Sequence, residues 1–496
     1  MNPSTRRKFI GQMAGAAAVA ALPAALRAQA DRAGARRPNV LLLMADDLRP
    51  ELHCHGVEGI RTPHIDALAA RSLRFNRAYC QYPLCNPSRS SMFTGHYPTQ
   101  TGVMDNRQWW GYRHPDYVSM FRRFRDAGYN TITEGKIFHI GIDDTDAWTV
   151  GGAQRRYAPD ASEHIDGAAS GGAAVAAAAT ADAATRTQTP ERASGSDRIV
   201  VLEGDGETYQ DYGHATRAIA RLKEYKDRDK PFLLACGFTN PHSPPRAPQR
   251  SYDQYDVAKV PLPVDYAPRP TVPPGFPALS VVPRNTDLFI GRDSTPESAR
   301  EMKRAYWAAV SFLDEQVGRV VQALDELKLA DNTIIVLTTD HGYHLGEKGR
   351  WSKAYSLFDV AVRIPLMISV PGGAANGRVC DRNVEMINLY RTMCELCDVP
   401  PPDGIEGVSM TPLLHDPGAA WDRPVYSVVA YRDALGRSVL TEGWRYTQWN
   451  EGEGGEVLFD EHADPHELKN LANDPQHAGK LAELRALLNK LPGRTR

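Results

Sequence analysis

Four short apolar runs recur along the chain, separated by segments with a different pattern. The runs cover residues 39–45 (NVLLLMA), 130–134, 231–238 (PFLLACGF) and 333–339 (TIIVLTT). Continuous apolar runs of this length are typical of strands that are buried on both faces of a parallel sheet. Between them, apolar residues at helical spacing predict helices over 119–127, 216–226 and 297–327. Strands alternating with helices predict an α/β fold with a doubly wound, mostly parallel sheet.

Two segments interrupt this alternation. Residues 167–196 are mostly Ala, Gly, Ser and Thr, which predicts a flexible surface insertion. Residues 261–283 are rich in proline and are expected to be extended and irregular.

The last part of the chain has a different texture. Past Pro400, turn residues separate short strand-like runs at 425–430 and 445–449, and a final helix is expected over 475–491. We therefore expect a catalytic α/β domain over 38–430. A smaller α+β subdomain with a small antiparallel sheet should follow over 431–496.

The first thirty residues are typical of a leader. A twin-arginine motif at 4–10 (STRRKFI) precedes a weakly apolar, Ala-rich stretch, and Ala28-Gln29-Ala30 supplies a cleavage pattern. The alternative is a membrane anchor, but the apolar stretch is too short and too rich in Ala and Gly to span a bilayer well. We expect residues 1–30 to be a signal peptide that is read by the Tat export machinery. The mature protein should then be periplasmic or secreted, without a stable membrane anchor.

Charge and cysteine content exclude several classes of protein. A formal net charge of −2 gives no general field for nucleic acid, so any anion must be recognised by a local group of cations. Seven cysteines are too few for a disulfide scaffold. Cys394 and Cys397 have redox or zinc spacing without a second pair, so either a buried pair or a single disulfide is expected there.

Ionisable residues follow each of the four predicted strands. They are Asp46 and Asp47, then Lys136 and His139, then His242, and finally Asp340 and His341. Taken singly, such residues are usually turn, cap or loop residues. In open α/β sheets, however, ligands bind at the carboxyl ends of the strands, where all of these residues should meet. Three carboxylates brought together would repel one another unless a cation neutralised them, and hard oxygen ligands suit calcium or magnesium.

The strongest local motif covers residues 85–95 (CNPSRSSMFTG). Pro87 stands where the first turn of a helix tolerates proline, and Gly95 stands where a helix ends. Cys85 is therefore expected just ahead of a helix N-terminus, which favours an anion. The alternative role of an isolated cysteine there is that of a small buried apolar residue.

This motif resembles the signature of the type I sulfatases, in which the cysteine is oxidised to formylglycine. The resemblance extends from Asp46 into the C-terminal unit. It is closest to the iduronate 2-sulfatase branch, through 135–139 (GKIFH), 308–327 and 340–353. It implies an alkaline-phosphatase-like fold and a sulfuric ester hydrolase that acts on a sulfated carbohydrate, with a uronate 2-O-sulfate as one candidate. It also implies a formylglycine-generating enzyme as a partner.

The resemblance implies a role for each matching residue. One calcium ion would be held by Asp46, Asp47, Asp340, His341 and an oxygen of the modified Cys85. Arg89 would hold the formylglycine hydrate, and Lys136 and Lys353 would clamp the sulfate oxygens. His242 would protonate the leaving alcohol, and His139 would take the proton that releases sulfate from the intermediate. Asn240 departs from the pattern, because the branch carries lysine there, so the sugar itself is not carried over.

Two other functions fit parts of the sequence. Phosphonate or phosphate ester hydrolases share the fold, but alkaline-phosphatase relatives use two metals and a Ser or Thr nucleophile. A non-catalytic binder of sulfated glycans would lack Cys85, Arg89 or a metal ligand, and the sequence has all of them.

Overall fold

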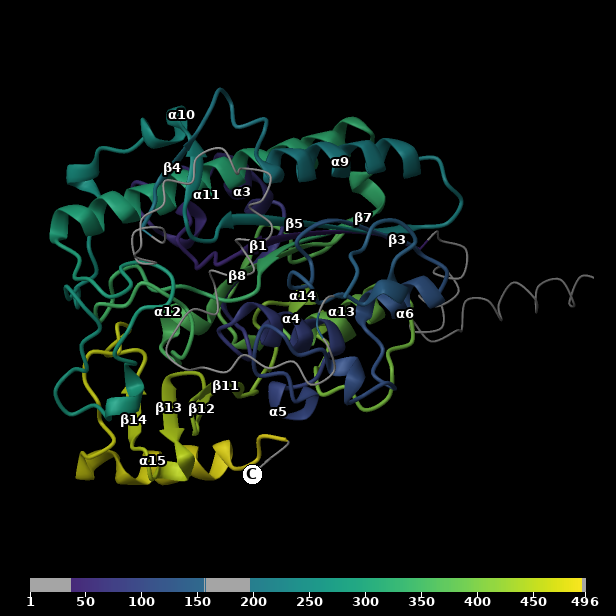
Figure 1. Ribbon diagram of the computed structural model, residues 1–496. Helices are drawn as coiled ribbons and strands as arrows, with labels where there is room; N and C mark the ends of the chain where they lie inside the picture. The colour runs from purple at the N-terminus through teal and green to yellow at the C-terminus, as the bar shows by residue number, and fades with distance from the viewer. Residues whose placement is uncertain (1–36, 156, 158–196, 493–496) are drawn as a thin grey trace, which may run out of the picture. The chain divides into compact units, whose positions relative to one another are not determined.

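The computed structural model describes residues 37–155, 157 and 197–492 (Figure 1). The expected signal peptide (1–30) and the whole of the expected insertion (167–196) lie outside the described residues. Among the residues that are described, no helix has both the length and the apolar composition needed to cross a bilayer.

The four predicted strands lie next to one another at one end of a mixed sheet. Its order is β10-β2-β8-β7-β1-β5-β3, with β9 also paired to β2. The bounds are β1 Asn39–Asp46, β2 Leu73–Tyr79, β3 Asn130–Gly135, β5 Phe232–Pro241, β7 Thr333–Thr339, β8 Arg363–Ser369, β9 Val379–Cys380 and β10 Val384–Glu385. Neighbouring strands in β7-β1-β5-β3 are parallel, whereas β8 runs antiparallel to both β7 and β2. The predicted mostly parallel, doubly wound sheet is confirmed.

Strand β1 shows why the central runs are apolar at every position. Leu41 and Leu43 pack into the core on one face of the sheet, and Val40 and Leu42 pack into the core on the other. Side chains of a strand alternate between faces, so a strand that is covered on both sides needs an uninterrupted apolar run.

Helices cover both faces of the sheet (Figure 1). One face carries α3 Pro63–Ala69, α9 Gln210–Tyr225, α10 Gln249–Tyr252 and α11 Pro296–Glu326. The other carries α4 Cys85–Thr94, α5 Pro98–Thr101, α6 Met120–Asp126, α13 Asn388–Leu396 and α14 Thr411–His415. The long helix α11 begins where its sequence dictates, because Thr295 and Ser298 form a capping box around Pro296. Cys394 and Cys397 are buried at the end of α13.

The C-terminal part forms an antiparallel sheet with its own helix. The sheet consists of β11 Val425–Tyr431, β12 Ala434–Leu440, β13 Trp444–Trp449 and β14 Glu456–Asp460, followed by α15 Ala478–Leu488. The sheet begins at Val425, so the expected boundary between 430 and 431 falls inside β11 and must move toward the N-terminus. The reason is a tight hairpin, in which Tyr431 pairs with Ala434 and Arg432 adopts a left-handed φ of 53°.

A buried ion cluster ties this sheet to the α/β layer. Arg445 of β13 lies 2.8 Å from Asp359 and Glu461 and 2.7 Å from Glu467, and all four side chains are nearly or fully buried. Asp359 belongs to α12 Asp359–Val362, which leads into β8. Removing one partner from such a cluster leaves uncompensated buried charge, so this contact fixes how the two sheets pack.

Glu385 is expected to make stability depend on pH. Its carboxyl accepts hydrogen bonds from the Tyr97 hydroxyl (2.8 and 3.0 Å) and from the Tyr426 amide (2.9 Å), and burial raises its pKa to about 8. The folded chain therefore holds this proton more tightly than the unfolded chain does. The free energy of unfolding should fall as pH rises from the unfolded pKa toward about 8.

Glu385→Gln cannot ionise and should lose this dependence. We expect its advantage over the parent protein to grow to the order of a few kcal/mol above pH 8. Thermal unfolding between pH 5 and pH 9 measures it, with Glu453→Gln as the control at an exposed position. Parallel stability curves for the parent and Glu385→Gln would contradict the assignment.

Candidate active site

Acidic, imidazole and thiol groups converge where β1 and β7 end. Asp46 ends β1 and Asp47 follows it, Asp340 and His341 follow β7, and Cys85 is the first residue of α4. One ligand atom from each of Asp46, Cys85, Asp340 and His341 lies within 4.8 Å of the others. Asp47, Cys85 and His242 form a second such group. Because both groups share Cys85, they describe one centre, and every side chain in it is buried.

Asp47 is held in an unusual conformation at this centre. Its φ is 63°, in the left-handed region that few non-glycine residues adopt. The Tyr306 hydroxyl of α11 donates to its carbonyl oxygen (2.8 Å), and its amide donates to Asp340 Oδ1 (3.3 Å). The Asp47 Oδ1 atom is buried without a hydrogen-bond partner and lies 3.6 Å from His341 Nε2. An orphaned carboxylate oxygen in this position fits a cation ligand.

His341 presents a lone pair to the same point. Its Nδ1 lies 3.0 Å from the carbonyl oxygen of Gly342, which can only accept, so the proton resides on Nδ1. Nε2 is then unprotonated, and it lies 3.5 Å from Asp340 Oδ2 and 3.4 Å from Cys85 Sγ. A hydrogen bond that fixes the tautomer in this way is typical of imidazole ligands to metals.

The carboxylates differ in how well they are compensated. Burial raises the pKa of Asp46, but the charges of Lys136 and Arg89 outweigh it and hold the pKa well below its usual value. Burial also raises the pKa of Asp47, and there Lys353 does not overcome it. The donor set of three carboxylates and one imidazole nitrogen therefore fits one divalent cation, which would supply the missing positive charge.

Arg89 contacts the carboxylates of Asp46 and Asp340. It is fully buried in α4, its Nε donates to Asp340 Oδ2 (2.9 Å), and its Nη2 lies 3.4 Å from Asp46 Oδ1. Its Nη1 donates to the carbonyl oxygens of Lys136 (2.8 Å) and Ile137 (2.7 Å). Arg89 thus orients two carboxylates and the loop after β3, and in the structure it acts on them rather than on Cys85 directly.

Cys85 is the first residue of α4 rather than the residue before it. Leu84 is the N-cap, because the helix hydrogen bonds begin one position earlier than the proline pattern suggested. Cys85 Sγ lies 3.5 Å from Asp46 Oδ1 and 3.9 Å from Lys136 Nζ. Burial and the Asp46 charge raise the pKa of the thiol well above its usual value. An unmodified Cys85 is therefore a protonated thiol and a poor nucleophile at neutral pH.

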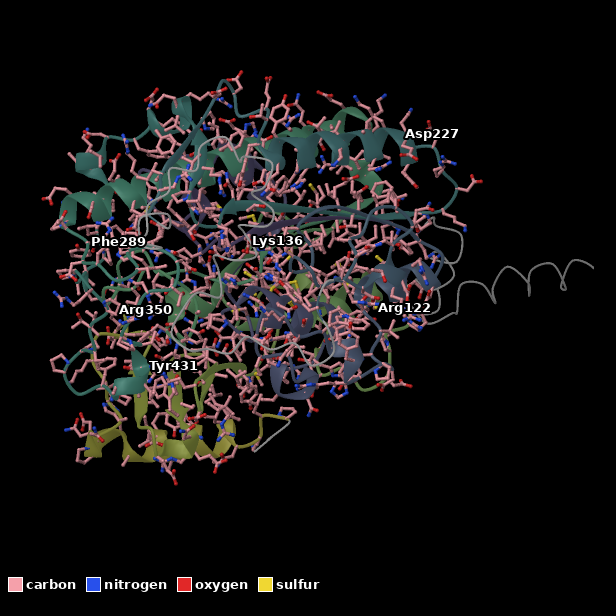
Figure 2. All side chains as sticks on the ribbon, viewed as in Figure 1. Arg122, Lys136, Asp227, Phe289, Arg350 and Tyr431 are labelled. Atoms are coloured by element: carbon pink, nitrogen blue, oxygen red, sulfur yellow. The ribbon has the colours of Figure 1, made fainter. Side chains whose placement is uncertain are left out.

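Two lysines contact the carboxylates of the centre. Lys136, labelled in Figure 2, directly follows β3, and its Nζ pairs with Asp46. Lys353 Nζ lies 2.8 Å from Asp47 Oδ2 and 3.1 Å from His242 Nε2. Lys353 also lies 3.5 Å from Asp287, whose Oδ2 is buried without a hydrogen-bond partner. Asp287 has no recognisable sequence signal, because it lies in an irregular stretch ahead of α11.

Both predicted catalytic histidines are uncharged in this environment. Burial and Lys353 lower the pKa of His242 to about 3, and its Nδ1 donates to the Ser243 carbonyl (2.7 Å). Burial and Lys136 lower the pKa of His139 well below its usual value, and its Nδ1 has no hydrogen-bond partner. Both histidines line a cavity of about 1030 Å³ that Lys136 also lines.

The Asn240 side chain does not take over the role of the expected lysine at this cavity. It is fully buried, and its Nδ2 donates to the carbonyl oxygens of Arg246 (2.9 Å) and Ala309 (3.4 Å). Asn240, which stands where we expected lysine, therefore has a structural role. Any cation near the leaving group must come from another residue.

Comparison with known proteins agrees with this geometry. Residues 38–399 match the sulfatase family, and residues 346–493 match the C-terminal region of N-sulphoglucosamine sulphohydrolase. The chain is 30% identical to mouse iduronate 2-sulfatase over 90% of its own length and 93% of the relative's. It is also 30% identical to a choline-sulfatase of Rhizobium meliloti, over 89% and 83% of the two chains.

Solved structures share the fold. A structure bound to its substrate D-glucosamine-2-N,6-O-disulfate superposes with a TM-score of 0.69 at 20% identity, over 92% of this chain and 97% of that one. A phosphonate monoester hydrolase of Agrobacterium radiobacter superposes with a TM-score of 0.71 at 21% identity, over 92% and 95%. The alkaline-phosphatase-like fold is confirmed, and the family match covers the sheet, the Cys85 helix and both acidic strand ends. The chain belongs to the sulfatase family and is a sulfatase enzyme.

Proposed function

We propose that this enzyme removes sulfate from a carbohydrate monoester through Cys85, oxidised to formylglycine, with one calcium ion. The observation that carries the proposal is the setting of Cys85. It lies among Asp46, His341 and Lys136, and its thiol is held protonated. A hydrated aldehyde at this position would supply a hydroxyl that attacks sulfur and a second hydroxyl whose deprotonation releases sulfate. The proposal requires a formylglycine-generating enzyme as a partner.

The cation would be held by Asp46, Asp47, Asp340 and His341. It would supply Lewis-acid stabilisation of negative charge at residue 85 and at the sulfuryl oxygens. Oxygen-rich ligand sets favour calcium or magnesium, and we propose calcium. Arg89 would keep Asp46 and Asp340 in place whether or not substrate is bound, because it is buried beneath both.

Lys136 and Lys353 would bind the sulfate oxygens as point charges. Both now pair with the carboxylates of Asp46 and Asp47, so each ammonium group is already at the centre. Electrostatic stabilisation of this kind is usually the largest contribution to such reactions.

His242 would protonate the leaving oxygen. Its Nδ1 is committed to the Ser243 carbonyl, so Nε2 is the atom that would carry the transferred proton. The nearby charge of Lys353 contributes to its low pKa, and a bound sulfate anion would offset that charge and favour protonation. His139, neutral and without a partner at Nδ1, would accept the proton that accompanies sulfate release.

A sugar sulfate is favoured by the cavity and by the relatives. Beyond Lys136, His139 and His242, the cavity is lined by Arg155 and Arg246, and its volume of about 1030 Å³ exceeds that of a small sulfate ester. Mouse iduronate 2-sulfatase is named for a sulfated uronate. We also propose export by the twin-arginine route to the periplasm or the medium, from the motif at residues 4–10.

The substrate class is tested by kcat/KM on a matched panel. Sulfated mono- and disaccharides, including a uronate 2-O-sulfate, should be cleaved with higher kcat/KM than an aryl sulfate, choline sulfate or a phosphonate monoester. The reason is that Arg155 and Arg246 line the same cavity as Lys136 and His242 and offer further cations to a substrate larger than a simple sulfate ester. If the aryl or choline ester had the highest kcat/KM, the carbohydrate assignment would be wrong. If the phosphonate had the highest kcat/KM, the assignment of sulfate ester hydrolysis as the main activity would be wrong.

A further inference from the structure

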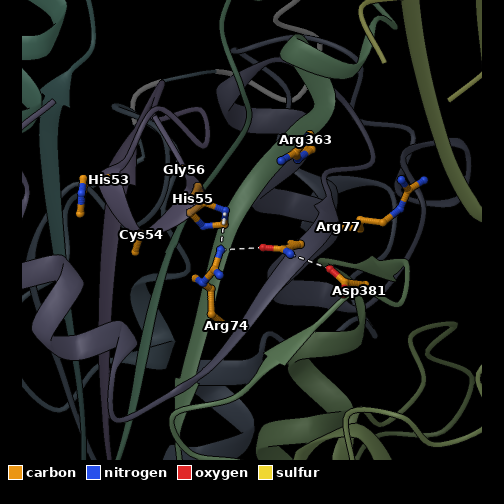
Figure 3. A pocket seen from close by; sticks show the side chains of 9 residues that line it. His53, Cys54, His55, Gly56, Arg74, Arg77, Arg363 and Asp381 are labelled. Atoms are coloured by element: carbon orange, nitrogen blue, oxygen red, sulfur yellow. Dashed lines mark hydrogen bonds between the residues drawn. The ribbon is translucent and has the colours of Figure 1, made fainter. Parts of the chain in front are cut away.

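A second polar cavity lies away from the catalytic centre, over β2 and β8 (Figure 3). It has a volume of about 520 Å³ and is bounded on one side by the short 3-10 helix η1 His53–His55. We call it the arginine pocket and define it by Arg74, Arg77, Arg363, His55 and Asp381. None of the residues that line it belongs to the centre around Cys85 or to the cavity of His139 and His242.

The pairing of two strands brings three arginine side chains to the lining of one cavity. Phe75 and Ala78 of β2 point into the core on one face of the sheet, which leaves Arg74 on the other. The ladder between β2 and β8 is irregular between Phe75 and Ala78, so both residues of that bulge, Asn76 and Arg77, can line the pocket. Arg363 joins them as the first residue of β8.

The charges that line the arginine pocket do not balance. Three arginines face one carboxylate, Asp381, and that carboxylate accepts a hydrogen bond from Asn76 (2.6 Å). Asp359 lies 3.4 Å from Arg363 Nη1 and Glu461 also acts on that guanidinium, but both carboxylates are shared with Arg445 at 2.8 Å. The residues that line the pocket therefore carry an excess of positive charge, on a chain whose formal net charge is −2.

Three buried donors in the pocket have no partner. They are Arg77 Nη2, Arg363 Nε and His55 Nε2. The tautomer of His55 follows from its neighbour, because Arg74 Nη1 lies 3.5 Å from His55 Nδ1 and an arginine can only donate. The His55 proton is then on Nε2, which makes all three unpaired atoms hydrogen-bond donors. Burial, with a smaller contribution from the charges of Arg74 and Arg363, lowers the pKa of His55 to about 3, so the imidazole is neutral.

We propose that the arginine pocket is a second, non-catalytic site for a tetrahedral oxyanion, either free sulfate or a sulfate group on a carbohydrate. Such a ligand offers only acceptors, and it pairs with several guanidinium groups at once through charge-assisted hydrogen bonds. It would satisfy the three unpaired donors and neutralise the excess charge. The site is independent of the catalytic assignment, because its residues and cavity are separate from it.

Sulfate binding to the full-length protein tests the proposal. Equilibrium dialysis with radiolabelled sulfate at constant ionic strength, with chloride as the balancing anion, should reveal a site that Arg74→Gln weakens by about tenfold or more. The matched control is Lys259→Gln, which removes the same charge from a side chain that is 84% exposed. Binding at the catalytic centre is common to both variants, so their difference isolates the pocket.

The outcomes separate the proposal from its alternatives. A sulfated disaccharide that binds the parent more tightly than free sulfate, and loses that advantage in Arg74→Gln, identifies the glycan as the source. The reverse order identifies free sulfate. Equal affinities of Arg74→Gln and Lys259→Gln for both probes would overturn the site.

A second variant protects the test against misfolding. If Arg74→Gln unfolds at a lower temperature than the parent, Arg363→Gln provides the same loss of charge from β8. Turnover of a small aryl sulfate should be unchanged in either variant, because neither residue touches the catalytic centre. Loss of that turnover without loss of sulfate binding would show instead that the pocket only supports the fold.

Discussion

Cys85→Ala is expected to lower kcat on every sulfate ester by about a thousandfold or more, the usual scale when a nucleophile is removed. The remaining lysines and carboxylates could still bind sulfate, but no group at residue 85 would attack sulfur. The fold should survive, because Cys85 is a small buried residue at the start of α4 and alanine favours helix.

The control for this variant is Cys236→Ala, which removes another fully buried thiol, within β5. It should retain kcat within a few-fold and lose only some stability from the smaller side chain. Steady-state kinetics and thermal unfolding on both variants give the comparison. Equal activity of Cys85→Ala and the parent would remove Cys85 from the mechanism.

Asp340→Asn should cost the enzyme its cation and most of its activity. Asp340 contributes one of three carboxylates at the centre, and one of its oxygens lies within 4.8 Å of the possible ligand atoms of Asp46, Cys85 and His341. An amide keeps the shape but removes the charge, so calcium affinity and kcat should each fall by about a hundredfold or more. Metal analysis after dialysis should find about one calcium per chain in the parent and far less in the variant.

Asp287→Asn is the matched control for the metal. Asp287 is a buried carboxylate beside Lys353 but lies outside the cation group, so its variant should keep the ion. Full activity of the parent after exhaustive chelation, or equal calcium content in Asp340→Asn, would contradict the assignment of the ligands.

Much of the fold could be predicted from residue pattern alone. The runs of β1, β5 and β7 are largely apolar because both faces of the sheet are covered there. Strand β3 (NTITEG) lies at the edge of the sheet and keeps polar residues. The site could be predicted for the same reason, since parallel strands deliver Asp46, Asp340 and His242 to one edge whatever their distance along the chain.

What could not be predicted depends on contacts without a local signal. Asp287 reaches Lys353 from an irregular segment that has no periodicity. The arginine pocket depends on a bulge in β2 that brings Asn76 and Arg77 to one place, and nothing in the pattern LRFNRAY marks it. The boundary expected at 430/431 falls within β11, because the hairpin that pairs Tyr431 with Ala434 keeps both residues in one sheet.

The chemical state of residue 85 in protein from the native host tests the central claim most directly. Trypsin should release the peptide from Ala78 to Arg89, which contains both Cys80 and Cys85. After alkylation, mass spectrometry should find a modified thiol at Cys80 and an aldehyde, which replaces CH2–SH by CHO, at residue 85. The aldehyde fraction of different preparations should rise in proportion to kcat. Two alkylated cysteines in a fully active preparation would contradict the account.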